Sequence, residues 1–134
     1  DSTTVTGLSD AGAHVSLIFD AVNPTYQLSY WTRDRTRGQT LPLAHVIHRA
    51  TRRNADLFGF HDRGLIAPGM RADINVIDYE NLGLGELAIQ NDLPAGGGRL
   101  MQGATGYIAT MIDGIITRRH DEDTGARPGR LVRS

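Results

Sequence analysis

Residues 107–117 read Tyr-Ile-Ala-Thr-Met-Ile-Asp-Gly-Ile-Ile-Thr, and they carry the clearest structural signal in the chain. Two apolar runs flank the dipeptide Asp113-Gly114. Asp-Gly is preferred in the two-residue type I′ turn of a β-hairpin, because both central residues of that turn need a positive φ. The stretch therefore predicts a tight β-hairpin in the C-terminal half of the chain.

The residues on either side of this hairpin also lack helical periodicity. Residues 72–78 alternate polar and apolar positions as a half-buried strand does. We expect a shorter strand at residues 63–66, followed by a turn at Pro68-Gly69. Residues 81–98 end in a Gly-rich run and are interpreted as a loop, and residues 118–134 form a polar tail rich in Gly, Pro and Arg.

The first part of the chain predicts three helices. Asn23-Pro24 is a helix-start signal, and the first helix is expected over residues 24–37 with Gly38 after its end. Thr40 is expected to cap a second helix, and a short third one covers residues 54–58, ended by Gly59. Apolar side chains of the second helix recur at i, i+3, i+4 and i+7, which predicts one buried face: Leu43, Val46, Ile47 and Ala50.

A short apolar run at residues 5–8 precedes these helices and predicts a strand. The order is therefore strand, helices and then short strands. It indicates the end of an α/β unit joined to part of a small β-sandwich. We place the first unit at residues 1–58 and the second at residues 59–134.

Composition excludes several classes of protein. The 134 residues carry a formal net charge of −1, which gives no reason to expect nucleic acid or an anionic membrane as a partner. No apolar run approaches the ~20 residues that span a bilayer, and the absence of Cys excludes disulfides and thiolate sites. Cytoplasmic residence is the default expectation. Because the sequence begins without Met, we expect a fragment or a processed product.

Three groups of polar residues are candidates for chemistry, each with an ordinary alternative. Asp10 follows the first strand within Gly7-Leu8-Ser9-Asp10-Ala11-Gly12-Ala13-His14, either as a site carboxylate at a strand end or as a partner of the local backbone. The Arg cluster at residues 33–37 either complements a helix dipole or holds an anion. His45 and His48 are expected on a solvated or interdomain face, because no acidic or Cys partner lies nearby.

Taken in order, these motifs resemble the amidohydrolase superfamily, and within it the N-acyl-D-amino-acid deacylases. The segment at residues 7–14 is similar to the loop after the eighth strand of the family's (β/α)₈ barrel. Residues 62–78, Asp-Arg-Gly-Leu-Ile-Ala-Pro-Gly-Met-Arg-Ala-Asp-Ile-Asn-Val-Ile-Asp, resemble its return to the β-sandwich, and the tail at residues 124–130 resembles its C-terminal end. Asn54 stands where relatives usually carry Pro.

The resemblance implies a zinc-dependent hydrolase of N-acyl-D-amino acids. In it Asp10 is both the catalytic carboxylate and a metal ligand, and His14 either contacts substrate or has a structural role. Zn²⁺ needs three or four ligands, and the family's His-x-His pair and its bridging residue are absent here. We therefore expect this chain to be inactive and to bind no zinc tightly by itself.

A complete barrel needs ~250 residues, so we expect an α+β fragment: the last strand and helices of a barrel joined to part of a sandwich. Its partner is then the N-terminal remainder of the same protein, or another copy of the chain. A cyclic-amidase relative, such as a hydantoinase or dihydroorotase, stays open as an alternative. So does a non-catalytic interaction domain.

Overall fold

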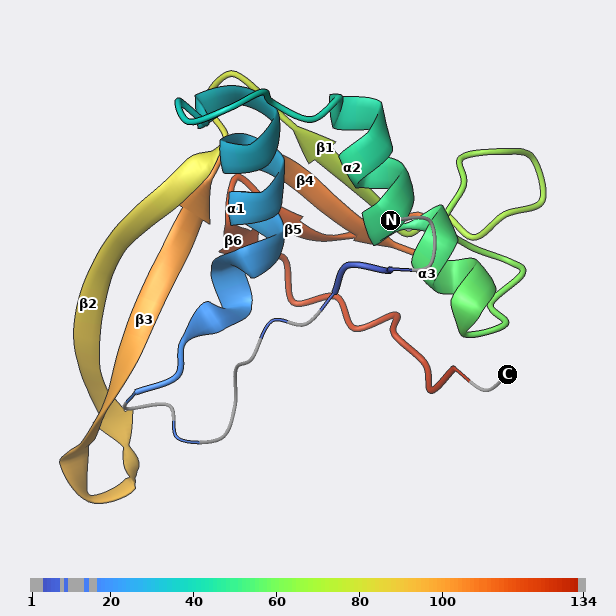
Figure 1. The fold of residues 1–134 in the computed structure, drawn as a ribbon. Helices are drawn as coiled ribbons and strands as arrows, with labels where there is room; N and C mark the ends of the chain where they lie inside the picture. Colours follow the sequence, from blue (N-terminus) through green and yellow to red (C-terminus); the bar gives the residue numbers. More distant parts are fainter. Residues whose placement is uncertain (1–3, 8, 10–13, 15–16, 133–134) are drawn as a thin grey trace.

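Three helices pack against antiparallel β-structure in this computed structural model, which describes residues 4–7, 9, 14 and 17–132 (Figure 1). The elements are the 3₁₀ turn η1 (Asp20–Val22), α1 (Asn23–Ser29), the π-helical turn η2 (Tyr30–Asp34), α2 (Leu43–Ala50) and α3 (Arg52–Leu57), followed by β1 (Ile74–Ile77), β2 (Gly83–Leu93), the turn η3 (Pro94–Gly96), β3 (Gly97–Thr105), β4 (Tyr107–Ile112), β5 (Ile115–Arg119) and β6 (Glu122–Asp123). The fold class is α+β. None of the described helices is long and apolar enough to cross a membrane.

The first helix is shorter than the predicted residues 24–37. Pro24 lies in the first turn of α1, as expected. The helix widens into η2, where the Arg35 N–H donates to the carbonyl of Tyr30, five residues back. The backbone becomes extended at Arg35, so Gly38, with φ +81°, belongs to the loop and is not the helix terminator.

Arg33 connects η2 to the segment between β1 and β2, and Arg35 makes local contacts. The Arg33 guanidinium pairs with Asp34 (Nε–Oδ1 2.6 Å) and donates to the backbone carbonyls of Tyr79, Glu80 and Leu82. The cation of Arg35 lies over the ring of Trp31, with its Cζ 4.6 Å from the ring centroid. These contacts use both guanidinium groups within the protein, which favours a structural role over anion binding.

Helices α2 and α3 only partly follow the predicted pattern. Val46 is buried, but Ile47 is 44% exposed, because α2 is an outer helix whose main neighbours are α1 and α3. The prediction that Ile47 faces the core is therefore wrong, and it is wrong for Ala50 too, which is also exposed. No side chain caps α2, so the predicted Thr40 cap is also wrong. Gly59, with φ +72°, ends α3 as predicted.

Four strands form one sheet in the order β1-β4-β5-β6, all antiparallel. The turn between β4 and β5 contains Asp113 (φ 53°) and Gly114 (φ 77°), so the predicted hairpin is confirmed. The strand predicted at residues 72–78 is confirmed as β1. The 3.1 Å bond from the Met70 N–H to the Ala67 carbonyl confirms the turn at Pro68-Gly69.

Two predicted strands are wrong in the described residues. Residues 4–7 are irregular. Residues 63–66 are irregular too, because they pass closely over α3. A Cβ on Gly64, whose φ is +80°, would lie 2.9 Å from the Cα of Arg52. A close approach to a helix at this point is incompatible with a regular strand.

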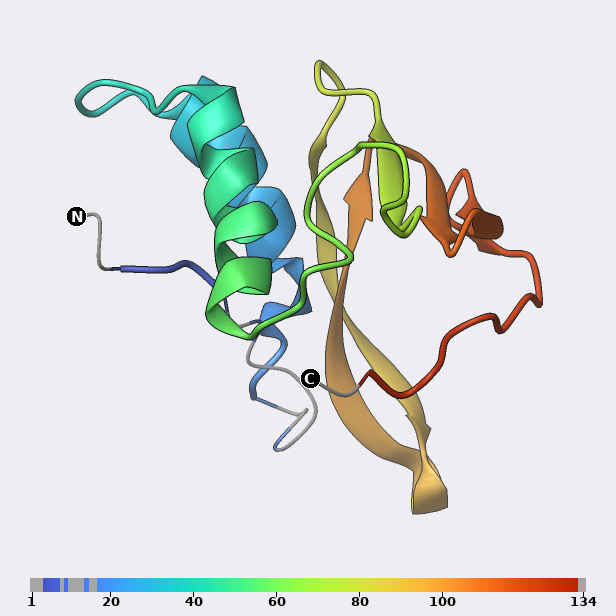
Figure 2. The same ribbon diagram turned by 90° about the vertical axis from the view of Figure 1, so that its right-hand side faces the viewer.

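The largest difference from prediction is a long hairpin formed by β2 and β3. The loop predicted at residues 81–98 is instead mostly strand, and it pairs antiparallel with residues 97–105. The hairpin is a separate two-stranded ribbon that extends from the body (Figure 1). Figure 2 shows the helices gathered on one side of the molecule, apart from the four-stranded sheet.

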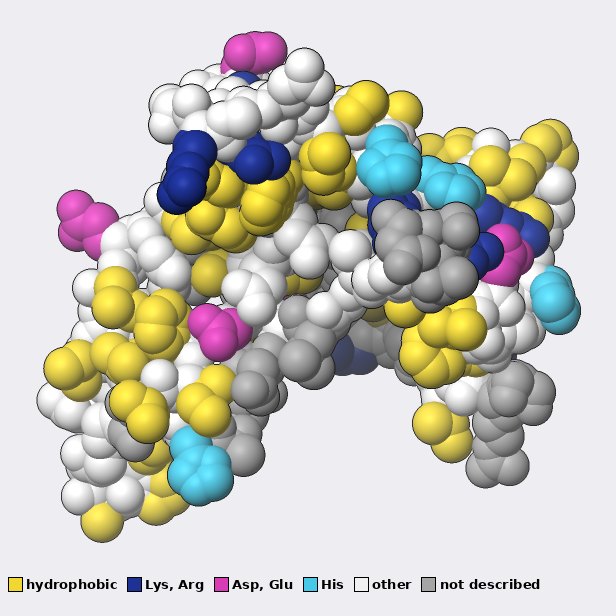
Figure 3. Space-filling view, viewed as in Figure 1, with side chains coloured by type: hydrophobic (Ala, Val, Ile, Leu, Met, Phe, Trp, Pro, Cys, Tyr) yellow, Lys and Arg dark blue, Asp and Glu magenta, His cyan; other side chains and the backbone are white. Residues whose placement is uncertain are grey.

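The buried core is small for a chain of this length. Its apolar members in the described residues come from both the helical and the β part: Val22, Val46, Ala55, Leu82 and Ala109. Leu82 is the most buried large side chain, with 1% exposed. Many large apolar side chains remain at the surface, and Figure 3 shows them gathered over the hairpin among other places. The assignment to a barrel end and a sandwich, with the boundary after residue 58, stays a prediction.

Candidate functional site

The segment from Gly7 to His14 is the predicted site, and the structure describes it only in part. Asp10 lies outside the described residues. His14 occupies an exposed turn with φ 52°, where its carbonyl accepts hydrogen bonds from the N–H groups of Leu17 and Ile18, both at 2.8 Å. This backbone geometry leads the chain into η1. The roles of Asp10 and His14 stay predictions.

Helices α2 and α3 hold the residues that lead into this segment. The Arg49 side chain donates to the carbonyl of Thr4, and the Asn54 side chain donates to the carbonyl of Thr6 (Nδ2–O 2.6 Å). Asn54 lies inside α3 and does not cap its N-terminus. The Thr6 hydroxyl is buried and has no hydrogen-bond partner in the described part of the chain. The approach to residues 7–14 is thus positioned by the two helices.

The described residues do not fit a zinc ion by themselves. Among them, no group of three or more His, Cys, Asp or Glu side chains is close enough to hold a metal. His45 and His48 are exposed on α2, as predicted, and His61 and His120 are exposed elsewhere.

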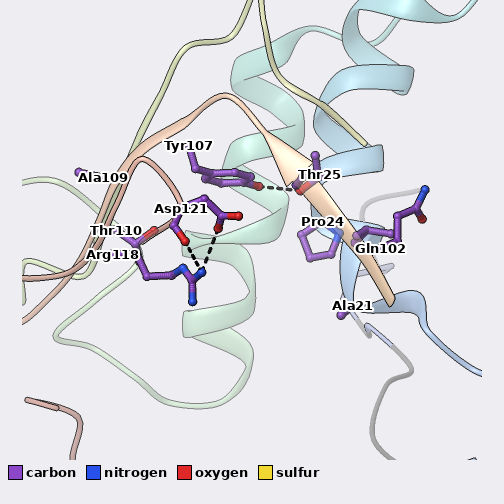
Figure 4. Close-up of a pocket in the computed structure, with 11 residues that line it drawn as sticks. Ala21, Pro24, Thr25, Gln102, Tyr107, Ala109, Thr110, Arg118 and Asp121 are labelled. Atoms are coloured by element: carbon purple, nitrogen blue, oxygen red, sulfur yellow. Dashed lines mark hydrogen bonds and ion pairs between the residues drawn. The ribbon is translucent and has the colours of Figure 1, made fainter. Parts of the chain in front are cut away.

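One hollow in the described residues lies where η1 and α1 meet β3 and the β4–β5 hairpin (Figure 4). Its volume is about 330 Å³. Apolar groups such as Val22, Pro24 and Ala109 form much of its wall. Among the described residues, no His lines it.

Two polar pairs project into this hollow. The Thr25 and Tyr107 hydroxyls are hydrogen-bonded to each other at 2.8 Å, and Thr25 is only 4% exposed. At the open side, Arg118 and Asp121 form an ion pair (3.1 Å; Figure 4). The arrangement offers hydrogen bonds and one charge pair, which suits positioning a polar group and supplies no nucleophile with an adjacent base.

Sequence reasoning missed these four residues. Thr25 and Tyr107 are 82 positions apart, and the sequence marks neither as a candidate for chemistry. Arg118 and Asp121 lie in a tail that the sequence marks only as polar. The contact between Thr25 and Tyr107 follows from the packing of α1 on the β-structure, which no local pattern encodes.

The C-terminal tail folds back on β6 through a second charge pair. Arg127 donates two hydrogen bonds to the Asp123 carboxylate (2.9 and 2.7 Å), and the Gly125 N–H donates a third at 2.8 Å. These donors, Arg127 foremost, lower the pKa of Asp123 from 3.8 to about 2. The pair orders the start of the predicted Thr-Gly-Ala-Arg-Pro-Gly-Arg tail.

Comparison with known families gives the family of the chain without using the geometry of the site. The sequence matches the model of the Amidohydrolase family over residues 1–117, which is most of its 134 residues. No curated protein and no solved structure matches it. The matched range contains the Gly7–His14 segment, all three helices and the first four strands. The chain therefore belongs to the amidohydrolase family.

Proposed function

We propose that the chain is the C-terminal portion of a zinc-dependent amidohydrolase that cleaves the amide bond of N-acyl-D-amino acids. The observation that carries this proposal is the family match over residues 1–117. The narrower choice of substrate rests on the sequence of residues 7–14 and of the tail at residues 124–130, which resemble the deacylase branch.

In this proposal Asp10 is the catalytic carboxylate and one metal ligand. The helices support that role indirectly, because Arg49 and Asn54 fix the backbone only a few residues before Asp10. His14 is exposed, so its imidazole is available to a substrate. The remaining zinc ligands are proposed to come from the N-terminal remainder of the same protein, since the described residues supply no ligand cluster.

The first experiment measures hydrolysis of N-acetyl-D-amino acids by the purified chain with added Zn²⁺. We expect no turnover by the chain alone. The same assay is then run on the chain expressed together with the coding region upstream of Asp1, where we expect turnover that depends on the metal. The L-enantiomers and a cyclic amide such as a hydantoin serve as competing substrates.

Variants at two acidic positions connect the activity to the predicted residue. Asp10→Asn should abolish turnover of the complemented protein. Asp20→Asn is the matched control, because Asp20 is a carboxylate in η1, outside residues 7–14, and should leave turnover unchanged. Robust turnover by the chain alone would contradict the need for a remainder. Preference for the cyclic amide would replace the deacylase with a hydantoinase-like enzyme.

A further inference from the structure

The hollow beside α1 is built by segments that lie far apart in the chain. Pro24 and Thr25 belong to α1, Gln102 and Ala104 belong to β3, and Tyr107 begins β4. The volume of about 330 Å³ falls within the range of small-molecule pockets, roughly 300–1,000 Å³. It equals the space of about eleven water molecules in the liquid. The hollow therefore has the size of a small metabolite.

The wall on the side of η1, α1 and β4 is mainly apolar. Val22 and Ala109 belong to the buried core, with 8% of each exposed, so packing holds this wall in place. The hydroxyls of Thr25 and Tyr107 are bonded to each other at 2.8 Å. An apolar group can therefore lie beside them without separating either hydroxyl from its partner. This side of the hollow fits an aliphatic side chain.

The opposite side carries charge. Arg118 and Asp121 are the charged side chains among the described residues that line the hollow. They come from β5 and the turn after it, whereas Pro24 and Thr25 lie across the hollow on α1 (Figure 4). Nη2 of Arg118 donates to the carboxylate of Asp121 at 3.1 Å and to its backbone carbonyl. Within the described part of the chain, Nε and Nη1 of Arg118 and Oδ2 of Asp121 keep their capacity for a ligand.

The two charges sum to zero, and this balance selects the class of ligand. An anion on Arg118 would lie beside the carboxylate of Asp121, and a cation on Asp121 would lie beside the guanidinium of Arg118. Like charges at such short range repel each other. A zwitterion instead meets each side chain with the opposite charge. A free α-amino acid carries both charges on one carbon, together with a side chain for the apolar wall.

We propose that this hollow binds a free α-amino acid with an aliphatic side chain. The carboxylate of the ligand lies on Arg118 and its ammonium group on Asp121, while the side chain lies against the wall formed by η1, α1 and β4. The proposal rests on the lining of the hollow and not on the deacylase activity. Either of the two can fail without the other.

The test is an NMR titration of the ¹⁵N-labelled chain of 134 residues with racemic leucine up to millimolar concentrations. We expect saturable shifts of the backbone signals of Thr25, Arg118 and Asp121. Isocaproate is leucine without the ammonium group, and isoamylamine is leucine without the carboxylate. Each should bind about two- to fivefold more weakly than leucine, which is the effect of one partly exposed charge pair.

Asp121→Asn tests the charge balance directly. Asp121 has φ +65°, a conformation that Asn also adopts readily, so the turn should persist. The variant leaves the charge of Arg118 unbalanced. Isocaproate should therefore bind about two- to fivefold more tightly, and leucine more weakly. Asp56→Asn is the matched control, because Asp56 also pairs with an Arg (2.6 Å to Arg52) but lies on α3, outside the hollow, and it should change neither affinity.

Three results would overturn the proposal. One is the absence of saturable shifts with leucine. Another is equal binding of leucine, the two singly charged probes and uncharged isoamyl alcohol, because the hollow would then select only an apolar group. The third is the same change of affinity in both variants, because the effect would then come from the net charge of the chain. Hydrolysis of N-acyl-D-amino acids is measured separately, and its result does not alter the outcome of these titrations.

Discussion

Of the described glycines, Gly106 comes closest to another backbone segment, and replacing it with Ala measures how much this crossing contributes to stability. Its φ is +91°, and an added Cβ would lie 2.7 Å from the Cα of Leu82 and 2.9 Å from the carbonyl oxygen of Asp78. Left-handed backbone costs an L-residue about 1–2 kcal/mol. Crowding of this kind typically adds about 1–3 kcal/mol. Gly106→Ala should therefore lower the free energy of unfolding by about 2–5 kcal/mol.

Gly69→Ala separates the two contributions. Gly69 has φ +85° but nothing within 4 Å of its Cβ position, so it should lose only the conformational part, about 1–2 kcal/mol. Thermal unfolding followed by circular dichroism converts each kcal/mol into a Tm shift of roughly 3–4 °C for a domain of this length. Equal Tm shifts in the two variants would refute the steric argument, because only Gly106 meets another backbone.

Three further variants probe the core, the hollow and the tail. Leu82→Ala should cost about 2–5 kcal/mol in urea denaturation, because a fully buried side chain leaves a cavity. Thr25→Val and Tyr107→Phe should each cost about 1–3 kcal/mol by leaving the other hydroxyl unpaired, and a double-mutant cycle should show that the double variant costs less than their sum. The lowered pKa of Asp123 stabilises the folded chain above pH 4, and this is lost as the pH falls from about 4 to about 2. In an NMR titration, Arg127→Gln should return that pKa toward 3.8.

Local chemistry explains which hairpin the sequence predicts. The turn of β4–β5 needs two residues with positive φ, and the dipeptide Asp113-Gly114 predicts such a turn. The turn of β2–β3 has positive φ at Ala95 (φ 60°) and at Gly96 (φ 73°), and of these two residues only Gly96 signals it in the sequence. A register shift between Leu84 and Leu87 also interrupts the alternation that identifies a strand. The longest hairpin is therefore only half signalled at its turn, and the interrupted alternation hides its first strand.

The candidate site also has one part that the sequence indicates and another part that it does not. The chemistry proposed for the site rests on residues 7–14, because a carboxylate and a His in one short segment are visible in the sequence. The hydrogen bond that holds the segment before residue 7 could not be predicted, because Thr6 and Asn54 are 48 positions apart and no pattern connects them. The Thr25–Tyr107 pair is hidden for the same reason. Packing of helices on strands decides these contacts, and propensity does not.

The hydrogen bond from Asn54 to Thr6 can be tested without an activity assay. Asn54→Ala keeps α3, because Ala favours helix, but it removes the 2.6 Å hydrogen bond to the Thr6 carbonyl. A lost hydrogen bond of this kind is worth about 0.5–1.5 kcal/mol. The backbone at Gly7 should become more mobile, seen as a lower ¹⁵N order parameter. Leu57→Ala, at a 60% exposed position of the same helix, should not change it. If both variants leave Gly7 equally ordered, α3 does not position the segment that carries Asp10.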